Sequence, residues 1–142
     1  MKNKILLLMI IGTLFSCSKN AENDTENILV GNWTLIQMTG SIPNSETSGA
    51  EMDWQETYLL NADGTFLKSR DKDGTTIEVS GTYNFINNSN ETLVELNFDS
   101  ESAIIGSCNS NSKETMKLES ETIFINTWNA CDGPELKYEK TN

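Results

Sequence analysis

The chain has 142 residues, enough for one domain, and its 21 acidic and 10 basic residues give a formal net charge of −11. It contains no histidine, which excludes a Ser-His-Asp or Cys-His catalytic set and a zinc site built from histidines. Nucleic acid is excluded as a partner because an acidic surface repels phosphates. The sequence offers no nucleophile–base pair, so we expect no enzyme, no cofactor and no metal site.

An export signal is predicted for residues 1–16. Lys2 and Lys4 form a positively charged start, and the apolar run Ile5–Ile11 follows. A helix needs about 20 apolar residues to cross a bilayer. The shorter run here fits the apolar core of a signal that is cleaved off.

The end of this signal resembles the lipobox of bacterial lipoproteins, with Leu14, Phe15 and Ser16 directly before Cys17. The resemblance implies cleavage before Cys17 and a lipid on its sulfur, which makes a membrane the first expected partner. An ordinary secretory signal that happens to end near a cysteine is the alternative. Ser18 is not the Asp that retains proteobacterial lipoproteins in the inner membrane, so the resemblance favours the outer membrane and leaves open which face carries the domain.

A flexible tether is predicted for residues 17–27, which are polar and lack an apolar pattern. Behind it, residues 28–142 form one domain. Short stretches of alternating apolar and polar residues, separated by turn residues, predict strands at 32–39, 53–61, 65–70, 75–85, 92–98, 115–119, 122–128 and 135–140. Eight strands joined mostly by hairpins predict an all-β fold, an antiparallel up-and-down barrel.

The segments between the strands carry their own signals. Asp63-Gly64 and Asp73-Gly74 provide the positive φ angles that tight hairpins need. Residues 40–52 are rich in Gly, Ser, Asn, Thr and Glu and predict a long loop with a short helix or a lid. Gly81 lies in the middle of a strand, which indicates a bulge or a sharp coil.

The start of the first strand resembles the lipocalin signature, Gly-x-Trp, through Gly31 and Trp33. Together with Asn61–Phe66 and Gly81-Thr82-Tyr83, this segment resembles the lipocalin-like lipoproteins common in Bacteroidetes. The resemblance implies that Gly31 turns the chain into the barrel and that Trp33 plugs its closed end. Lipocalins commonly stack an arginine of the last strand on this tryptophan. Here the last strand offers only Lys137 or Lys140, which can lie over an indole ring but cannot stack as a planar group.

The two cysteines left over, Cys108 and Cys131, form an even pair in an exported and therefore oxidising context. We expect a disulfide between them. It would close a loop of about 24 residues and contribute roughly 3 kcal/mol in the chain-entropy model. Two free thiols are the alternative.

An eight-stranded barrel is wide enough for one small ligand or for its own side chains. A membrane-tethered carrier of a small apolar molecule is the first function hypothesis, and a filled barrel that binds an envelope protein, as a complex subunit, inhibitor or immunity factor, is the second. Trp54 and Trp128 are candidates for the rim of the open end, and Glu56 and Glu78 are expected on the solvent face. The candidate pocket residues for the first hypothesis are Tyr58, Phe66, Tyr83, Phe98, Met116 and Ile125.

Overall fold

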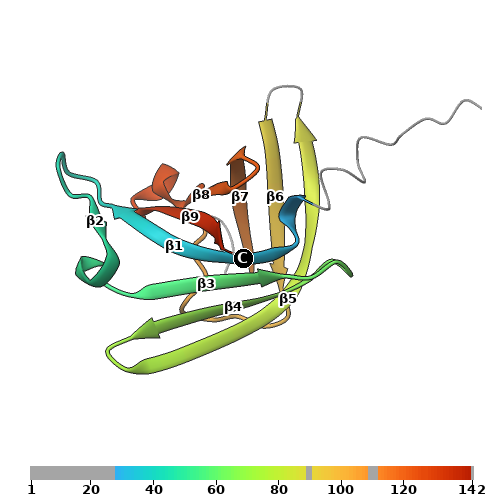
Figure 1. Ribbon diagram of the computed structural model, residues 1–142, viewed down its shortest axis with the longest axis horizontal. Coiled ribbons are helices and arrows are strands. Elements are labelled where there is room, and N and C mark those ends of the chain that lie inside the picture. The colour runs from blue at the N-terminus through green and yellow to red at the C-terminus, as the bar shows by residue number, and fades with distance from the viewer. Residues whose placement is uncertain (1–27, 89–90, 109–111, 142) are drawn as a thin grey trace, which may run out of the picture.

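The computed structural model describes residues 28–88, 91–108 and 112–141 (Figure 1). The predicted signal (1–16) and tether (17–27), with Cys17, lie outside the described residues. The strands are β1 (Gly31–Thr39), β2 (Thr47–Ser48), β3 (Gln55–Leu60), β4 (Thr65–Lys72), β5 (Thr75–Asn88), β6 (Glu91–Phe98), β7 (Lys113–Ser120), β8 (Ile123–Asn126) and β9 (Glu135–Thr141). Two single turns of 3₁₀ helix, η1 (Gly49–Glu51) and η2 (Trp128–Cys131), interrupt the connections.

The strands form a closed antiparallel barrel. Apart from β2, each strand pairs with the next one along the chain, and β1 also pairs with β9, which closes an eight-stranded ring. The two-residue strand β2 folds back onto the end of β1, where Met38 pairs with Thr47. The all-β barrel predicted from the sequence is confirmed.

Two Asp-Gly turns act as the sequence predicts. In the β4–β5 turn, Asp73 and Gly74 have φ angles of 53° and 75°. In the β3–β4 turn, Gly64 has a φ of 82°, and the Asp63 carboxylate accepts hydrogen bonds from the backbone N–H and the hydroxyl of Thr65. Tight turns with positive φ suit the twist of antiparallel strands.

Gly81 lies where β5 leaves one neighbour for the next. Residues 75–82 pair with β4 and residues 81–88 pair with β6, with no register shift at Gly81, so the strand coils there without a bulge (Figure 1). A Cβ on Gly81 would lie 2.0 Å from the Asn97 carbonyl oxygen and 2.8 Å from the Phe66 ring. Only glycine therefore lets β6 and Phe66 approach so closely.

The two ends of the barrel differ in their connections. The closed end holds the start of β1 and the short β3–β4 and β7–β8 turns, and the open end holds the longer connections 40–54, 99–112 and 127–134. The core between them consists of buried apolar side chains from all eight strands of the ring, together with Leu29, Met52 and Ile104. No helix in the described ranges is long and apolar enough to cross a membrane.

Candidate functional site

The closed end is sealed around Trp33. Its ring is fully buried, stacks on Phe124 with ring centroids 3.9 Å apart, and donates its indole N–H to the Leu29 carbonyl oxygen. The Lys140 ammonium lies 5.8 Å from the Trp33 centroid and donates to the Ile28 carbonyl oxygen. Gly31 has a φ of 135°, as expected where the chain turns into the barrel. Lys140 of the last strand therefore lies over the indole ring of Trp33.

Five of the six candidate pocket residues belong to the core or pack against it. Tyr58, Phe66, Phe98 and Met116 are buried core residues, and Tyr83 is partly buried against the same core, with its hydroxyl donating to the Asn61 carbonyl oxygen. The inward orientation expected for Ile125 is wrong. Phe124 and Asn126 are the buried residues of β8, and side chains alternate along a strand, so Ile125 lies on the outer face.

Four charged side chains, which we call the mouth cluster, fill the open half of the interior: Glu56, Lys68, Arg70 and Glu114. Lys68 is 1% exposed, and its ammonium lies 2.6 Å from Glu114 Oε1 and 3.1 Å from Glu56 Oε1. Arg70 Nε donates to Glu56 Oε2. The formal charges sum to zero, which is the condition under which buried charges can be tolerated at all.

Each carboxylate of the mouth cluster also accepts a hydrogen bond from a buried tyrosine. The Tyr58 hydroxyl donates to Glu114 Oε2 at 2.5 Å, and the Tyr138 hydroxyl donates to Glu56 Oε1 at 2.6 Å. Burial raises the pKa of both hydroxyls well above the usual value, and the negative charge of the neighbouring carboxylates raises both pKa values further. Both hydroxyls therefore stay protonated as donors.

A segment of the 99–112 connection covers the mouth cluster, and we call residues 102–108 the lid. The Ile104 carbonyl oxygen accepts hydrogen bonds from Lys68 Nζ at 2.7 Å and Arg70 Nη2 at 3.0 Å. The Gly106 backbone N–H donates to Glu114 Oε1. The lid thus supplies backbone groups that the buried charges would otherwise lack.

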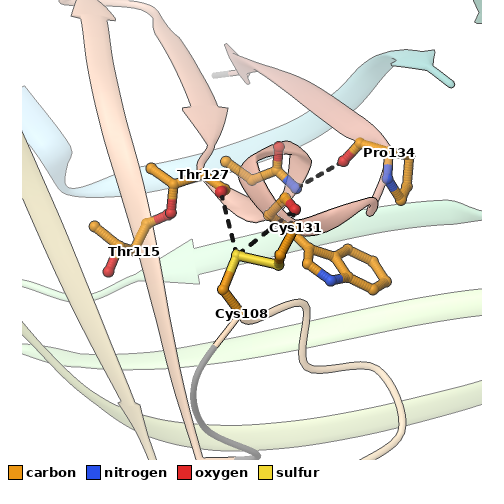
Figure 2. Close-up of a disulfide and its surroundings, with 7 residues drawn as sticks. Cys108, Thr115, Thr127, Cys131 and Pro134 are labelled. Carbon is orange, nitrogen blue, oxygen red and sulfur yellow. Dashed lines mark hydrogen bonds between the residues drawn. A yellow bond between two sulfur atoms is a disulfide. The ribbon is translucent and has the colours of Figure 1, made fainter. Parts of the chain in front are cut away.

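A disulfide between Cys108 and Cys131 ties the lid to η2, which confirms the expected pairing (Figure 2). The Trp128 ring packs between lid and turn, since a Cβ added to Gly106 or Gly133 would lie within 2.6 Å of its ring atoms. Trp128 is therefore a packing residue of the open end. Trp54 is partly buried, and the Arg70 guanidinium lies 4.2 Å from its ring centroid.

Sequence reasoning missed the mouth cluster. Glu56 was expected on the solvent face and is 1% exposed, so that expectation is wrong. The signal was present in the alternation: Lys68 and Arg70 share the inward face with Phe66, and Glu114 shares it with Met116. Charged residues at inward positions of three strands predict a buried ionic network. A hydropathy pattern alone does not predict it, because it assigns charged residues to the surface.

We predict that Lys68→Met lowers the free energy of unfolding by about 3–5 kcal/mol, because it leaves two buried carboxylates without their shared cation. Lys117→Met is the matched control, since Lys117 pairs with Glu91 on the exposed surface and its loss should leave the free energy of unfolding nearly unchanged. Denaturant unfolding of both variants measures the difference. Adding Glu114→Gln to Lys68→Met should recover part of the loss, and equal effects of the two lysine variants would contradict the buried network.

A second prediction concerns alkaline pH. In an unfolded chain a tyrosine loses its proton near pH 10, whereas the raised pKa of the buried hydroxyls keeps theirs to higher pH. The folded state then binds more protons, so the free energy of unfolding falls as pH rises above about 10, by roughly 1.4 kcal/mol per pH unit for each tyrosine. Tyr138→Phe should remove one such contribution from unfolding curves recorded from pH 9 to 11.5. Parallel curves for the two proteins would refute the assignment.

No protein-family model, no curated protein and no solved structure matches this chain. A proposal for its function therefore depends on the residues and geometry of the barrel itself. The decisive feature is an interior occupied by core side chains and the mouth cluster, with the lid hydrogen-bonded over it.

Proposed function

We propose that this protein is a lipoprotein of the bacterial cell envelope, anchored through Cys17, whose filled barrel presents its open end to another protein. The single observation that carries the proposal is the mouth cluster with its lid. Four charged groups and their backbone partners occupy the space that a small apolar ligand would enter. Placing an apolar molecule there would strip those charges of their partners, which costs several kcal/mol.

Interaction at the open end is further supported by the exposed apolar side chains. Ile42 is 71% exposed in the 40–54 connection, the most exposed of the large apolar side chains in the described part of the chain. Ile77, near the β4–β5 turn at the same end, is 42% exposed. A rigid barrel that displays such side chains on fixed loops loses little conformational entropy on binding. A complex subunit, an inhibitor or an immunity factor would all use a surface of this kind.

Anchoring through Cys17 is supported by the order of the N-terminal segments: a basic start, an apolar run, the lipobox-like Leu14–Cys17 and a polar stretch. Several acyl chains on one residue are needed for stable membrane attachment, since one chain binds only weakly. The outer membrane is favoured because Ser18, the residue after Cys17, is not the Asp that retains proteobacterial lipoproteins in the inner membrane. An anchored domain meets its partner in two dimensions, which suits an interaction between envelope proteins.

We predict that Cys17→Ser abolishes the incorporation of an alkyne-labelled fatty acid in bacteria and moves the protein from the membrane to the soluble fraction. The matched control is the double variant Cys108→Ser/Cys131→Ser, which removes the disulfide and should keep the fatty acid label. Click chemistry on the immunopurified protein measures the label. Retention of the label in Cys17→Ser would refute the anchor.

Partner binding is tested with two exposed apolar residues at opposite ends of the barrel. We predict that Ile42→Ser weakens cross-linking to the envelope partner at least ten-fold, because a well-buried isoleucine at an interface contributes about 1.5–3 kcal/mol. Leu59→Ser, on the outer wall of β3 near the closed end, is the control, since Leu59 is 38% exposed. Equal cross-linking yields for the two variants would show that the open end is not the interface.

A further inference from the structure

A recess of about 370 Å³ lies at the open end, outside the mouth cluster. The end of β1, the loop after it, the start of β3 and the turn before β9 surround it. Its volume is at the lower end of the range for small-molecule sites. The residues that line it include Met38, Ser45, Asp53, Trp54, Asp132 and Pro134.

One wall of the recess is fixed by the 40–54 connection. The antiparallel pairing of Met38 with Thr47 holds this loop against β1. Gln55 Nε2 donates to the Gly49 carbonyl oxygen at 2.7 Å. The Ser45 hydroxyl donates to the Ile42 carbonyl oxygen at 2.6 Å. The loop therefore has a defined shape before any ligand arrives, which lowers the entropy cost of binding.

The opposite wall is fixed by the turn around η2. Asn126 is only 7% exposed. Its side-chain NH₂ donates to the Pro134 carbonyl oxygen, and its side-chain oxygen accepts a hydrogen bond from the Leu136 backbone N–H. Asp132 ends η2 in the left-handed conformation, with a φ of 69°, directly after the disulfide-bonded Cys131. Both walls thus hold one carboxylate each, Asp53 on the first and Asp132 on the second.

Asp53 and Asp132 are both exposed to solvent in the recess. Within the described ranges, neither carboxylate makes an ion pair or a hydrogen bond, and the buried Trp54 indole N–H has no acceptor. Two cations lie near the Trp54 ring, but Arg70 is already paired with Glu56, and only Lys72, 5.9 Å from the ring centroid, offsets the carboxylates. The local balance is one negative charge, in a chain with a formal net charge of −11.

We propose that this recess binds an alkylammonium group, either on a free small amine or on a lysine side chain of the partner. The ammonium would lie between Asp53 and Asp132, and the alkyl stem would lie on Met38, Pro134 and Trp54. A charged donor facing a carboxylate makes a stronger hydrogen bond than a neutral one. An anion would meet two carboxylates and is excluded by repulsion. In its lysine form the inference rests on the proposed function, since it names the chemistry that the partner would insert.

The test uses the mature lipidated protein, ¹⁵N-labelled, in micelles of a neutral detergent. Each tryptophan indole N–H gives one resonance, and Trp33, hydrogen-bonded to Leu29 at the closed end, is an internal reference. Titration with n-butylammonium chloride should shift the Trp54 resonance saturably, with a Kd at or below about 10 mM, and should leave Trp33 unmoved. The neutral isostere n-butanol should shift it at least ten-fold less strongly. Equal shifts with both, or no saturable shift, would overturn the inference.

A pair of double variants with equal charge changes isolates the site. Asp53→Asn/Asp132→Asn should raise the Kd for butylammonium at least ten-fold, and asparagine is tolerated in the left-handed conformation of position 132. Glu119→Gln/Glu121→Gln also removes two negative charges, but at the exposed β7–β8 turn of the closed end. This variant should leave the Kd within two-fold of the unchanged protein. Equal losses in the two variants would reduce the effect to general electrostatic attraction and overturn the site.

The source of the ammonium is separated by a second ligand, N-acetyl-lysine methylamide. Binding at least as tight as that of butylammonium supports a lysine side chain, and ten-fold weaker binding supports a free amine. The results for the ammonium site and for the proposed function can be told apart. If Ile42→Ser loses partner cross-linking but the protein does not bind butylammonium, the open-end interface stands and the recess is not an ammonium site. If the protein binds butylammonium but Ile42→Ser cross-links normally, the ammonium site stands and the open-end protein interface is refuted.

Discussion

The ion pairs of Lys68 with Glu56 and Glu114 are the constraint on which the rest of the open end depends. Removing a charge from water costs several kcal/mol, and only close partners and further hydrogen bonds recover that cost. Lys68 from β4 reaches Glu56 from β3 and Glu114 from β7 across the interior, so the network links opposite walls of the barrel. Each of the two tyrosines donates one further hydrogen bond to a carboxylate of the network. The barrel can form this interior only when all of these strands are in register.

The lid follows from the same requirement. Two cations converge on the Ile104 carbonyl oxygen, and Glu114 accepts the Gly106 N–H, so a backbone segment completes what the side chains leave unsatisfied. A lid held by hydrogen bonds alone could open by local unfolding. The disulfide at Cys108 and the Trp128 ring between two glycines restrict that opening, and they fix the η2 turn at the same time. Satisfaction of buried charge thereby determines the shape of the outer surface.

Much of the fold could be predicted from alternation and turn chemistry. Residues 65–70 and 135–140 were predicted as strands and lie within β4 and β9, because apolar alternation and Asp-Gly turns act locally. The expected faces of Glu56 and Ile125 were wrong for opposite reasons. Glu56 was assigned to solvent because of its charge, although it alternates in phase with the buried Tyr58. Ile125 was assigned to the interior because it is apolar, although its neighbour Phe124 is the residue of β8 that stacks on Trp33. The recess could not be predicted, since it joins loops that are distant in sequence, and only closure of the barrel brings Asp53 near Asp132.

The difference between the two ends indicates where this barrel can acquire specificity. Each strand of the ring is bound to two neighbours, so a change in the wall disturbs two ladders. At the closed end, Trp33, Phe124 and Lys140 are packed against one another and against the start of β1. Within the described ranges, the connections at the open end carry no ladder beyond the two residue pairs of β2. Their side chains can therefore change at little cost to the barrel, provided that the lid backbone continues to satisfy Lys68 and Glu114. An interior that holds core side chains and the mouth cluster is thus compatible with a variable binding surface, because the part of the open end that must stay fixed is a set of backbone groups.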